Sequence, residues 1–147
     1  MTIRYVVLGA GRQGVAAAYD MVLHGNAEAV VLADLDLALA RAGAQKVNGL
    51  LGGDTVSARQ VDAADEDAVS TVLNGADSAL STVPPYLNVG ISRAAIAAGA
   101  HLCDLGGEIE FVWQQLALEE EAREAGVSII PDCGLLPGMG NTLAAYT

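Results

Sequence analysis

The stretch that decides the fold runs from Ile3 to Gly14 and reads IRYVVLGAGRQG. Its apolar run, Tyr5 to Leu8, is short and rich in β-branched residues, which is typical of a central strand of a parallel sheet that is buried on both faces. A helical pattern follows shortly after the strand. Between them, Gly9, Gly11 and Gly14 have the spacing G-x-G-x-x-G, which predicts a turn that binds the phosphates of a dinucleotide.

Each glycine of this turn has a distinct expected task. Gly9 allows the tight passage from strand to helix, and Gly11 lets a pyrophosphate approach the backbone because it has no Cβ. Gly14 lets the helix lie close to the strand, and the helix N-terminus then faces the phosphates. Arg12 either steadies the pyrophosphate charge or faces solvent. The predicted residues of the phosphate site are Gly9, Ala10, Gly11, Arg12, Gln13 and Gly14.

A second apolar run, Ala29 to Ala33, ends at Asp34, twenty residues after Gly14. This is the offset expected for a carboxylate that binds the ribose hydroxyls of adenosine, so Asp34 and the adjacent Leu35 are predicted cofactor contacts. We expect NAD as the cofactor. NADP is disfavoured because the carboxylate would repel its 2′-phosphate and because no arginine follows at once.

Strand and helix patterns alternate along the whole chain. They predict one α/β domain over residues 1–147, a Rossmann doubly wound parallel sheet of six strands in the order 3-2-1-4-5-6. The later strands are expected at 55–61, 77–83, 101–104 and 127–130, and helices include a long one at 110–125 and a last one at 139–146.

Ligands of such sheets lie beyond the carboxyl ends of the strands. The adenosine half is therefore expected near Asp62 and Ala63, although Asp62 is as well suited to capping the next turn. The nicotinamide half is expected over strands four to six. The residues predicted around its ring are Ser81, Thr82, Val83, Pro84, Tyr86, Asp104, Gly107 and Pro137. The catalytic residues stay open, with Tyr86 and Asp104 as candidates.

Composition excludes several classes of function. The net charge of −11, with seven basic residues scattered along the chain, argues against nucleic acid as a partner. No apolar run is long enough for a membrane span, and nothing at the N-terminus resembles a signal peptide. Cys103 and Cys133 form no metal-binding spacing; they are expected to fill the core, with a redox pair as the alternative. We expect a cytoplasmic protein without a metal site.

Several stretches together resemble the cofactor domain of the saccharopine dehydrogenase-like family. They are VLGAGRQG, LADLD, VDAAD, AGAHLCDLGG and AGVSIIPDCGLLPGMGN. Within the family the lysine dehydrogenases that oxidise the carbon bearing the ε-amino group are the most similar. The resemblance implies an NAD-linked oxidoreductase that acts on an amino acid or related amine, and a homo-oligomer in its full-length form. It also implies a second domain, absent from this chain, that supplies much of the substrate pocket.

Other interpretations remain open. One is a saccharopine- or carboxynorspermidine-type reductase of the same family, usually linked to NADP. Another, from a different class, is a nucleotide-sensing regulatory domain of the kind attached to potassium transporters. The stretches DLGG, at Asp104 to Gly107, and PDCGLLPG, at Pro131 to Gly138, argue against a sensor, which has no need for them. A methyltransferase is disfavoured by the glycine spacing.

Overall fold

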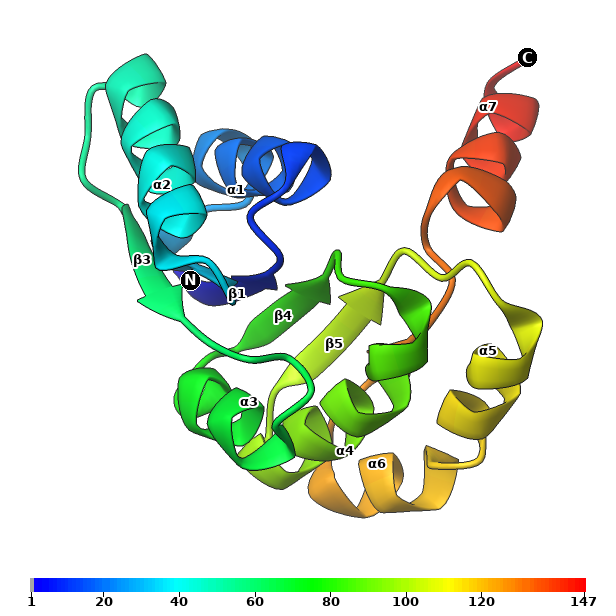
Figure 1. Cartoon of the computed structure of the whole chain (residues 1–147). Helices are drawn as coiled ribbons and strands as arrows, with labels where there is room; N and C mark the ends of the chain where they lie inside the picture. Colours follow the sequence, from blue (N-terminus) through cyan, green and yellow to red (C-terminus); the bar gives the residue numbers. More distant parts are fainter. Residues whose placement is uncertain (1) are drawn as a thin grey trace.

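A computed structural model describes residues 2–147, which form one parallel sheet with helices on both faces (Figure 1). The strand order is β3-β2-β1-β4-β5-β6, and every pair of neighbours is parallel, as predicted. The six strands are β1 (Ile3–Leu8), β2 (Ala27–Asp34), β3 (Val56–Gln60), β4 (Ser78–Ser81), β5 (His101–Asp104) and β6 (Ile129–Ile130).

The helices divide between the two faces. Figure 1 shows α1 and α2 on one side of the sheet and α3 to α6 on the other, with α7 standing apart near the C-terminus. Short helical turns, η1 and η2, precede α4 and α7. The bounds are α1 (Arg12–His24), α2 (Leu37–Leu51), α3 (Glu66–Leu73), η1 (Pro85–Leu87), α4 (Asn88–Ala98), α5 (Ile109–Leu116), α6 (Glu119–Ala125), η2 (Leu135–Met139) and α7 (Gly140–Tyr146).

Strand β1 lies at the centre and is buried on both faces, as its apolar run predicts. Val6 and Leu8 point into the core beneath α3 and α4, whereas Val7 points into the core beneath α1 and α2. The alternation follows from the two-residue period of a strand. Small residues such as Ala18 and Ala44 line the second core, so α1 and α2 can approach the sheet closely.

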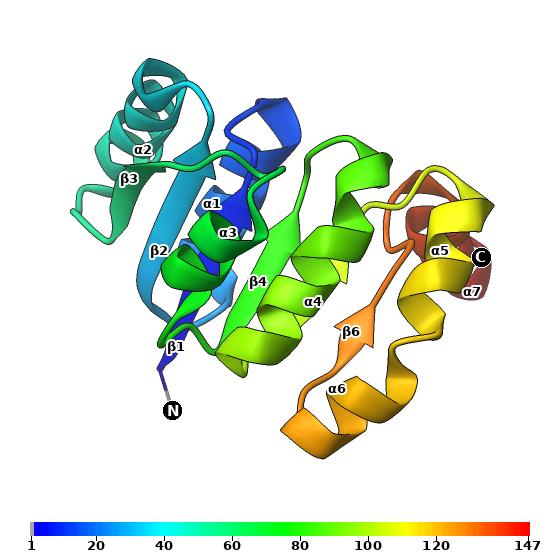
Figure 2. The ribbon, with the colours of Figure 1, turned by 60° about the horizontal axis from the view of Figure 1, so that its bottom comes forward.

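The prediction of one continuous helix over 110–125 is wrong. The segment forms two helices, α5 and α6, that meet at an angle (Figure 2). The N–H of Leu118 bonds to the carbonyl of Gln115, three residues back, at 3.0 Å, which is a tightened final turn. The turn lets Leu118 and Ala122 become buried next to α4. Tertiary packing therefore overrides the local helical pattern here.

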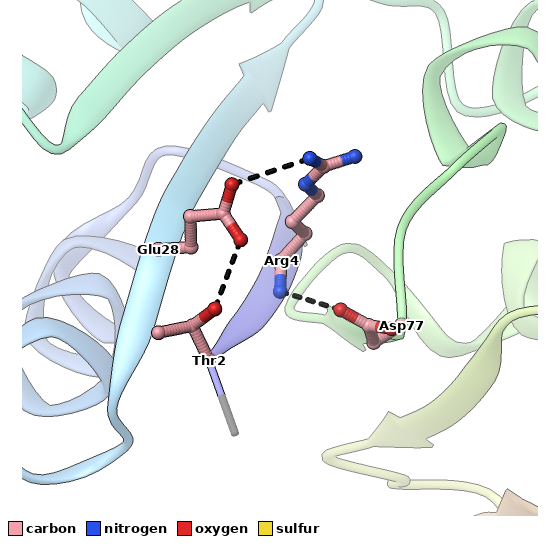
Figure 3. Close-up of polar contacts among 4 residues, drawn as sticks. All are labelled: Thr2, Arg4, Glu28 and Asp77. Atoms are coloured by element: carbon pink, nitrogen blue, oxygen red, sulfur yellow. Dashed lines mark hydrogen bonds and ion pairs between the residues drawn. The ribbon is translucent and has the colours of Figure 1, made fainter.

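At the end of the sheet opposite the glycine turn, polar contacts join the amino-terminal ends of β1, β2 and β4 (Figure 3). Glu28 accepts hydrogen bonds from the Thr2 hydroxyl at 3.0 Å and from the Arg4 guanidinium at 3.2 Å. The backbone N–H of Arg4 donates to the Asp77 carboxylate at 2.7 Å. The hydrogen bond from Thr2, and secondarily Arg4, lowers the pKa of Glu28.

Candidate functional site

The turn between β1 and α1 has the geometry that its glycines predict. Gly9 has a φ of +100°, which a side chain would strain, and a Cβ there would lie 2.5 Å from the Thr82 hydroxyl oxygen. A Cβ on Gly14 would overlap the carbonyl of Gly9, so close helix packing requires glycine at both positions. The Thr82 hydroxyl is within hydrogen-bond distance of the Leu8 and Gly9 carbonyls, at 3.0 and 3.1 Å, and holds the turn to β4.

Gly11 differs from the other two glycines of the turn, Gly9 and Gly14. A Cβ at this position would meet nothing within 4 Å, so the space in front of it is open. Helix α1 begins at the next residue, Arg12, and its first N–H groups have no carbonyl one turn earlier to bond. Such groups, together with the helix dipole, attract anions. The turn therefore offers an open, anion-attracting backbone surface at Gly11.

Asp34, at the end of β2, is tied to the glycine turn. One carboxylate oxygen accepts the N–H of Ala10 at 2.7 Å, and the other accepts the N–H of Asp36 at 2.9 Å. A carboxylate has about four lone-pair positions, so it can accept further hydrogen bonds. Asp34 can thus fix the turn and still bond a ligand hydroxyl from the same position.

A cleft of about 490 Å³ opens beyond the carboxyl ends of β1, β2, β3 and β4. It brings together nine of the residues predicted from sequence as cofactor contacts, together with Tyr86. The nine are Gly9, Gly11, Asp34, Leu35, Asp62, Ala63, Thr82, Val83 and Pro84. Ala10 contributes through its backbone bond to Asp34. Most of the predicted cofactor contacts therefore lie along one cleft.

Besides Ala10, three residues of the predicted phosphate site do not line this cleft, namely Arg12, Gln13 and Gly14. Arg12 lines an adjoining apolar groove of about 660 Å³ between α1 and α2, which shares Gly11 and Leu39 with the cleft, and Gln13 is exposed and does not line the cleft. Sequence reasoning also missed Leu39 and Leu87, which line the cleft from α2 and η1. Both belong to apolar patterns that equally indicate core packing, so the pattern alone could not assign them to a site.

The remaining acidic candidate near the adenosine end, Asp62, caps its own turn, because its carboxylate accepts the N–H of Ala64 at 2.9 Å. Of the two open catalytic candidates, Tyr86 is 61% exposed at the mouth of the cleft. Asp104 is fully buried and is not part of the cleft wall. Its carboxylate accepts N–H groups from Gly106 and Gln115, both at 2.7 Å.

The cysteines are both free thiols. Burial, followed by the neighbouring Cys133, raises the pKa of Cys103 to about 11. Burial is also the largest cause that raises the pKa of Cys133, although this residue is exposed. Within residues 2–147, no three His, Cys, Asp or Glu side chains are grouped so that they could hold a metal ion. None of the described helices combines the length and the apolar character needed to cross a bilayer.

Comparison with known proteins places this geometry in a family. The carboxynorspermidine synthase of Vibrio cholerae serotype O1 is 28% identical over 103 residues, which is 62% of this chain and 25% of that protein. Among solved structures, saccharopine dehydrogenase (L-Glu forming) from Saccharomyces cerevisiae superposes with a TM-score of 0.74 at 24% identity, over 98% of this chain and 30% of the other.

Quinate dehydrogenase from Corynebacterium glutamicum, solved in complex with NAD, superposes with a TM-score of 0.62 at 23% identity, over 88% of this chain and 44% of the other. At these identities the solved structures establish the fold. The chain spans about a quarter of the length of the Vibrio relative. The sequence model of one family, the saccharopine dehydrogenase NADP binding domain, matches residues 5–130. This chain therefore belongs to that family of NAD(P)-binding Rossmann domains, as its motifs indicate.

Proposed function

We propose that this domain binds NAD in the cleft that Gly11 and Asp34 line. The observation that carries the proposal is their arrangement in one cleft. The open backbone at Gly11 and the start of α1 suit the pyrophosphate, and the Asp34 carboxylate lies where the adenosine ribose hydroxyls would reach it. Leu35, 63% exposed beside Asp34, offers an apolar surface to adenine.

The charge of the cleft favours NAD over NADP. The only charged side chains among its described lining residues are the carboxylates Asp34 and Asp62, and no lysine or arginine accompanies them. A 2′-phosphate placed on the ribose would bring a second anion next to Asp34, and no guanidinium or ammonium among the described lining residues would pair with it. The description of the family names NADP as the cofactor, whereas we propose NAD for this chain.

For the complete protein we propose hydride transfer from an amino acid or related amine to NAD, with L-lysine as the first substrate to test. Family membership and the DLGG and PDCGLLPG stretches support this proposal. The nicotinamide would lie beyond β4 to β6, near Val83, Pro84 and Tyr86. A homo-oligomeric state of the full-length protein belongs to the same proposal.

Catalysis requires more than this cleft. The reacting carbon must be held within about 3–3.5 Å of the nicotinamide with water excluded, and the ends of β4 to β6 supply only one wall. The sheet face opposite α4 leaves Ile130 50% exposed and Cys103 only partly buried, as expected of a surface that another element covers. We therefore expect a second domain to close the site, and we expect the 147 residues to bind NAD without turnover.

A second candidate function is a carboxynorspermidine- or saccharopine-type reductase that uses NADPH. The 28% identity to the carboxynorspermidine synthase and the family description favour it. The two candidate functions differ in the cofactor and in the direction of hydride transfer. A dehydrogenase should reduce NAD with an amine, whereas a reductase should oxidise NADPH in the presence of an amine and a carbonyl compound.

The test has two stages. Calorimetry on the 147-residue chain should show tighter binding of NAD than of NADP, and equal affinity or a preference for NADP would exclude the proposed role of Asp34. NADH absorbance is then followed with a panel of amino acids, using this chain and the same chain continued by its native downstream sequence. Turnover with L-lysine by the longer protein alone supports the proposal. Turnover by the short chain would contradict the two-domain argument.

A further inference from the structure

The loops that follow β5 and β6 are joined by one buried side chain. A single carboxylate oxygen of Asp104 accepts the N–H of Gly106 at 2.7 Å and the N–H of Asp132 at 3.0 Å. The backbone carbonyl of Asp104 accepts the N–H of Cys133 at 2.8 Å. Asp104 therefore fixes both loops, although they lie more than twenty residues apart in the chain.

Steric fit locks the two loops together. Gly106 has a φ of +65°, and a Cβ on it would overlap the Asp132 carboxylate. A Cβ on Gly134 would overlap the carbonyl of Leu105. Asp132 itself has a φ of +63°, a conformation that few residues other than glycine adopt. The two segments, 105–107 and 131–134, thus form one interlocked unit, which we call the double loop.

A series of buried hydrogen bonds connects the Asp104 carboxylate to α5 and α4. Gln115 on α5 donates from its Nε2 to the second carboxylate oxygen of Asp104 at 2.7 Å and to the Ser92 hydroxyl at 3.0 Å. Ser92 on α4 donates in turn to the carbonyl of Asn88 at 2.7 Å. All four residues are buried. Unmade bonds inside a protein are costly, so this series of hydrogen bonds fixes the orientation of the Asp104 carboxylate.

The double loop lies at the carboxyl ends of β5 and β6, beside the cleft. A Cβ on Gly107 would lie 3.5 Å from the ring of Pro85, which directly follows Pro84 in the cleft wall. In doubly wound sheets, the half of a dinucleotide beyond the pyrophosphate extends over this side of the switch between β1 and β4. The double loop is thus within reach of the nicotinamide half and distant in the sheet from Asp34.

We propose that Asp104 is a positioning residue that sets the double loop as a wall for the nicotinamide half of the cofactor. The inference rests on the proposed NAD binding. It also gives Asp104 a role that its burial permits, because the carboxylate acts through Gly106, Asp132 and Cys133 and does not touch the substrate.

The test compares NAD with ADP, because ADP carries the adenosine and pyrophosphate but lacks the nicotinamide. We expect the 147-residue chain to bind NAD more tightly than ADP in calorimetry. In Asp104→Asn, one of the two carboxylate oxygens becomes an NH2 group that faces the N–H donors of Gly106, Asp132 or Gln115, so the double loop should lose its fixed position. NAD affinity should then fall about tenfold while ADP affinity stays within about twofold. A loss of overall fold would lower both affinities together, whereas a loop effect changes their ratio.

A reciprocal change provides the rescue. In the double variant Asp104→Asn with Gln115→Glu, the new amide at 104 can donate to the new carboxylate at 115. The Ser92 hydroxyl can turn from the Asn88 carbonyl to donate to the same carboxylate, so the buried bonds are restored with their polarity reversed. We expect the NAD to ADP affinity ratio to recover to within about threefold of the original. Asn48→Ala serves as the control, since it removes hydrogen bonds of 2.8 and 3.0 Å to the Val56 backbone, outside the cleft and the double loop, and the ratio should not change.

Gly106→Ala should push the two loops apart while residue 104 stays aspartate. This variant provides the test if Asp104→Asn does not fold. It should produce the same selective loss of NAD affinity. An unchanged affinity ratio in Gly106→Ala, or equal binding of NAD and ADP by the unmodified chain, overturns the role of Asp104. Absence of binding of both ligands to the unmodified chain overturns the proposed NAD site, and this inference with it.

Discussion

The carboxylate of Asp34 accepts the backbone N–H of Ala10 at 2.7 Å, which joins the end of β2 to the glycine turn after β1. The acid expected from sequence to read the ribose therefore also holds the turn that receives the pyrophosphate. Since the second oxygen bonds the N–H of Asp36, any substitution of Asp34 alters both the charge of the cleft and the local backbone.

Asp34→Asn should narrow the preference for NAD over NADP. The amide removes the charge that repels a 2′-phosphate and leaves one of the two backbone N–H groups without an acceptor. Loss of charge-assisted hydrogen bonds of about 1.5–3 kcal/mol would weaken NAD binding roughly 10- to 150-fold. Calorimetry with both cofactors measures the change. Asp54→Asn removes the same charge from an exposed loop outside the cleft and should leave both affinities as they were. An Asp34→Asn variant with unaltered selectivity would show that Asp34 does not read the ribose.

The two thiols should react in a fixed order. Burial raises the pKa of Cys103 to about 11, so at pH 8 only about one molecule in a thousand carries the thiolate there. The pKa of Cys133 is also raised, but its side chain is exposed. Iodoacetamide at pH 8 should modify Cys133 first, and both thiols more slowly than a cysteine peptide, as followed by mass spectrometry. In denaturant the two should react at equal rates; faster labelling of Cys103 in the folded protein would contradict the burial of its thiol.

The contacts of Glu28 predict a pH dependence at acidic pH. The pKa of Glu28 lies below its ordinary value of 4.5 in the folded chain, mainly because Thr2 donates a hydrogen bond to it and secondarily because of Arg4. The unfolded chain therefore takes up the proton at higher pH, so the contribution to stability is present above pH 4.5 and is lost as pH falls through the lowered value. The effect should be small, because Glu28 and Arg4 are both about half exposed.

Carboxyl resonances in NMR titrations measure this shift directly. In the unmodified chain Glu28 should titrate below pH 4.5, and Thr2→Val should move its midpoint upward. Thermal unfolding gives the second readout, since Glu28→Gln should lower the melting temperature at pH 7 and not below the folded pKa. A Glu28 midpoint that Thr2→Val leaves in place would mean that the contact in Figure 3 does not persist in solution.

Local geometry explains why the glycine turn could be predicted from sequence. The tasks of Gly9 and Gly14 depend on backbone conformation and on neighbours a few residues away, and G-x-G-x-x-G after an apolar strand specifies both. The strand order then followed from the fold that this turn opens. The ribose contact of Asp34 stays a prediction, and its bond to Ala10 could not be anticipated from spacing alone.

The parts that sequence did not predict depend on contacts between distant segments. The break between α5 and α6 follows from the burial of Leu118 and Ala122 beside α4, which a helical pattern does not encode. The burial of Asp104 depends on the meeting of two loops and Gln115, so an acid at a strand end looked equally suited to a cleft.

The glycine turn allows binding and stability to be separated. Gly11→Val places its side chain in open space, where we expect the pyrophosphate, so NAD affinity should fall at least about tenfold while the melting temperature stays nearly unchanged. Gly14→Val forces the new side chain into the Gly9 carbonyl, and overpacking of this kind costs on the order of 3 kcal/mol, so the melting temperature should drop by several degrees.

Gly49→Val is the matched control for Gly11→Val, because a Cβ on Gly49 also meets nothing within 4 Å, yet the residue lies near the far end of α2, outside the cleft. It should leave NAD affinity unchanged. Calorimetry and thermal unfolding of all three variants measure both quantities. If Gly11→Val binds NAD as tightly as Gly49→Val does, the phosphates do not lie at the start of α1, and the binding site must be sought on another surface of the domain.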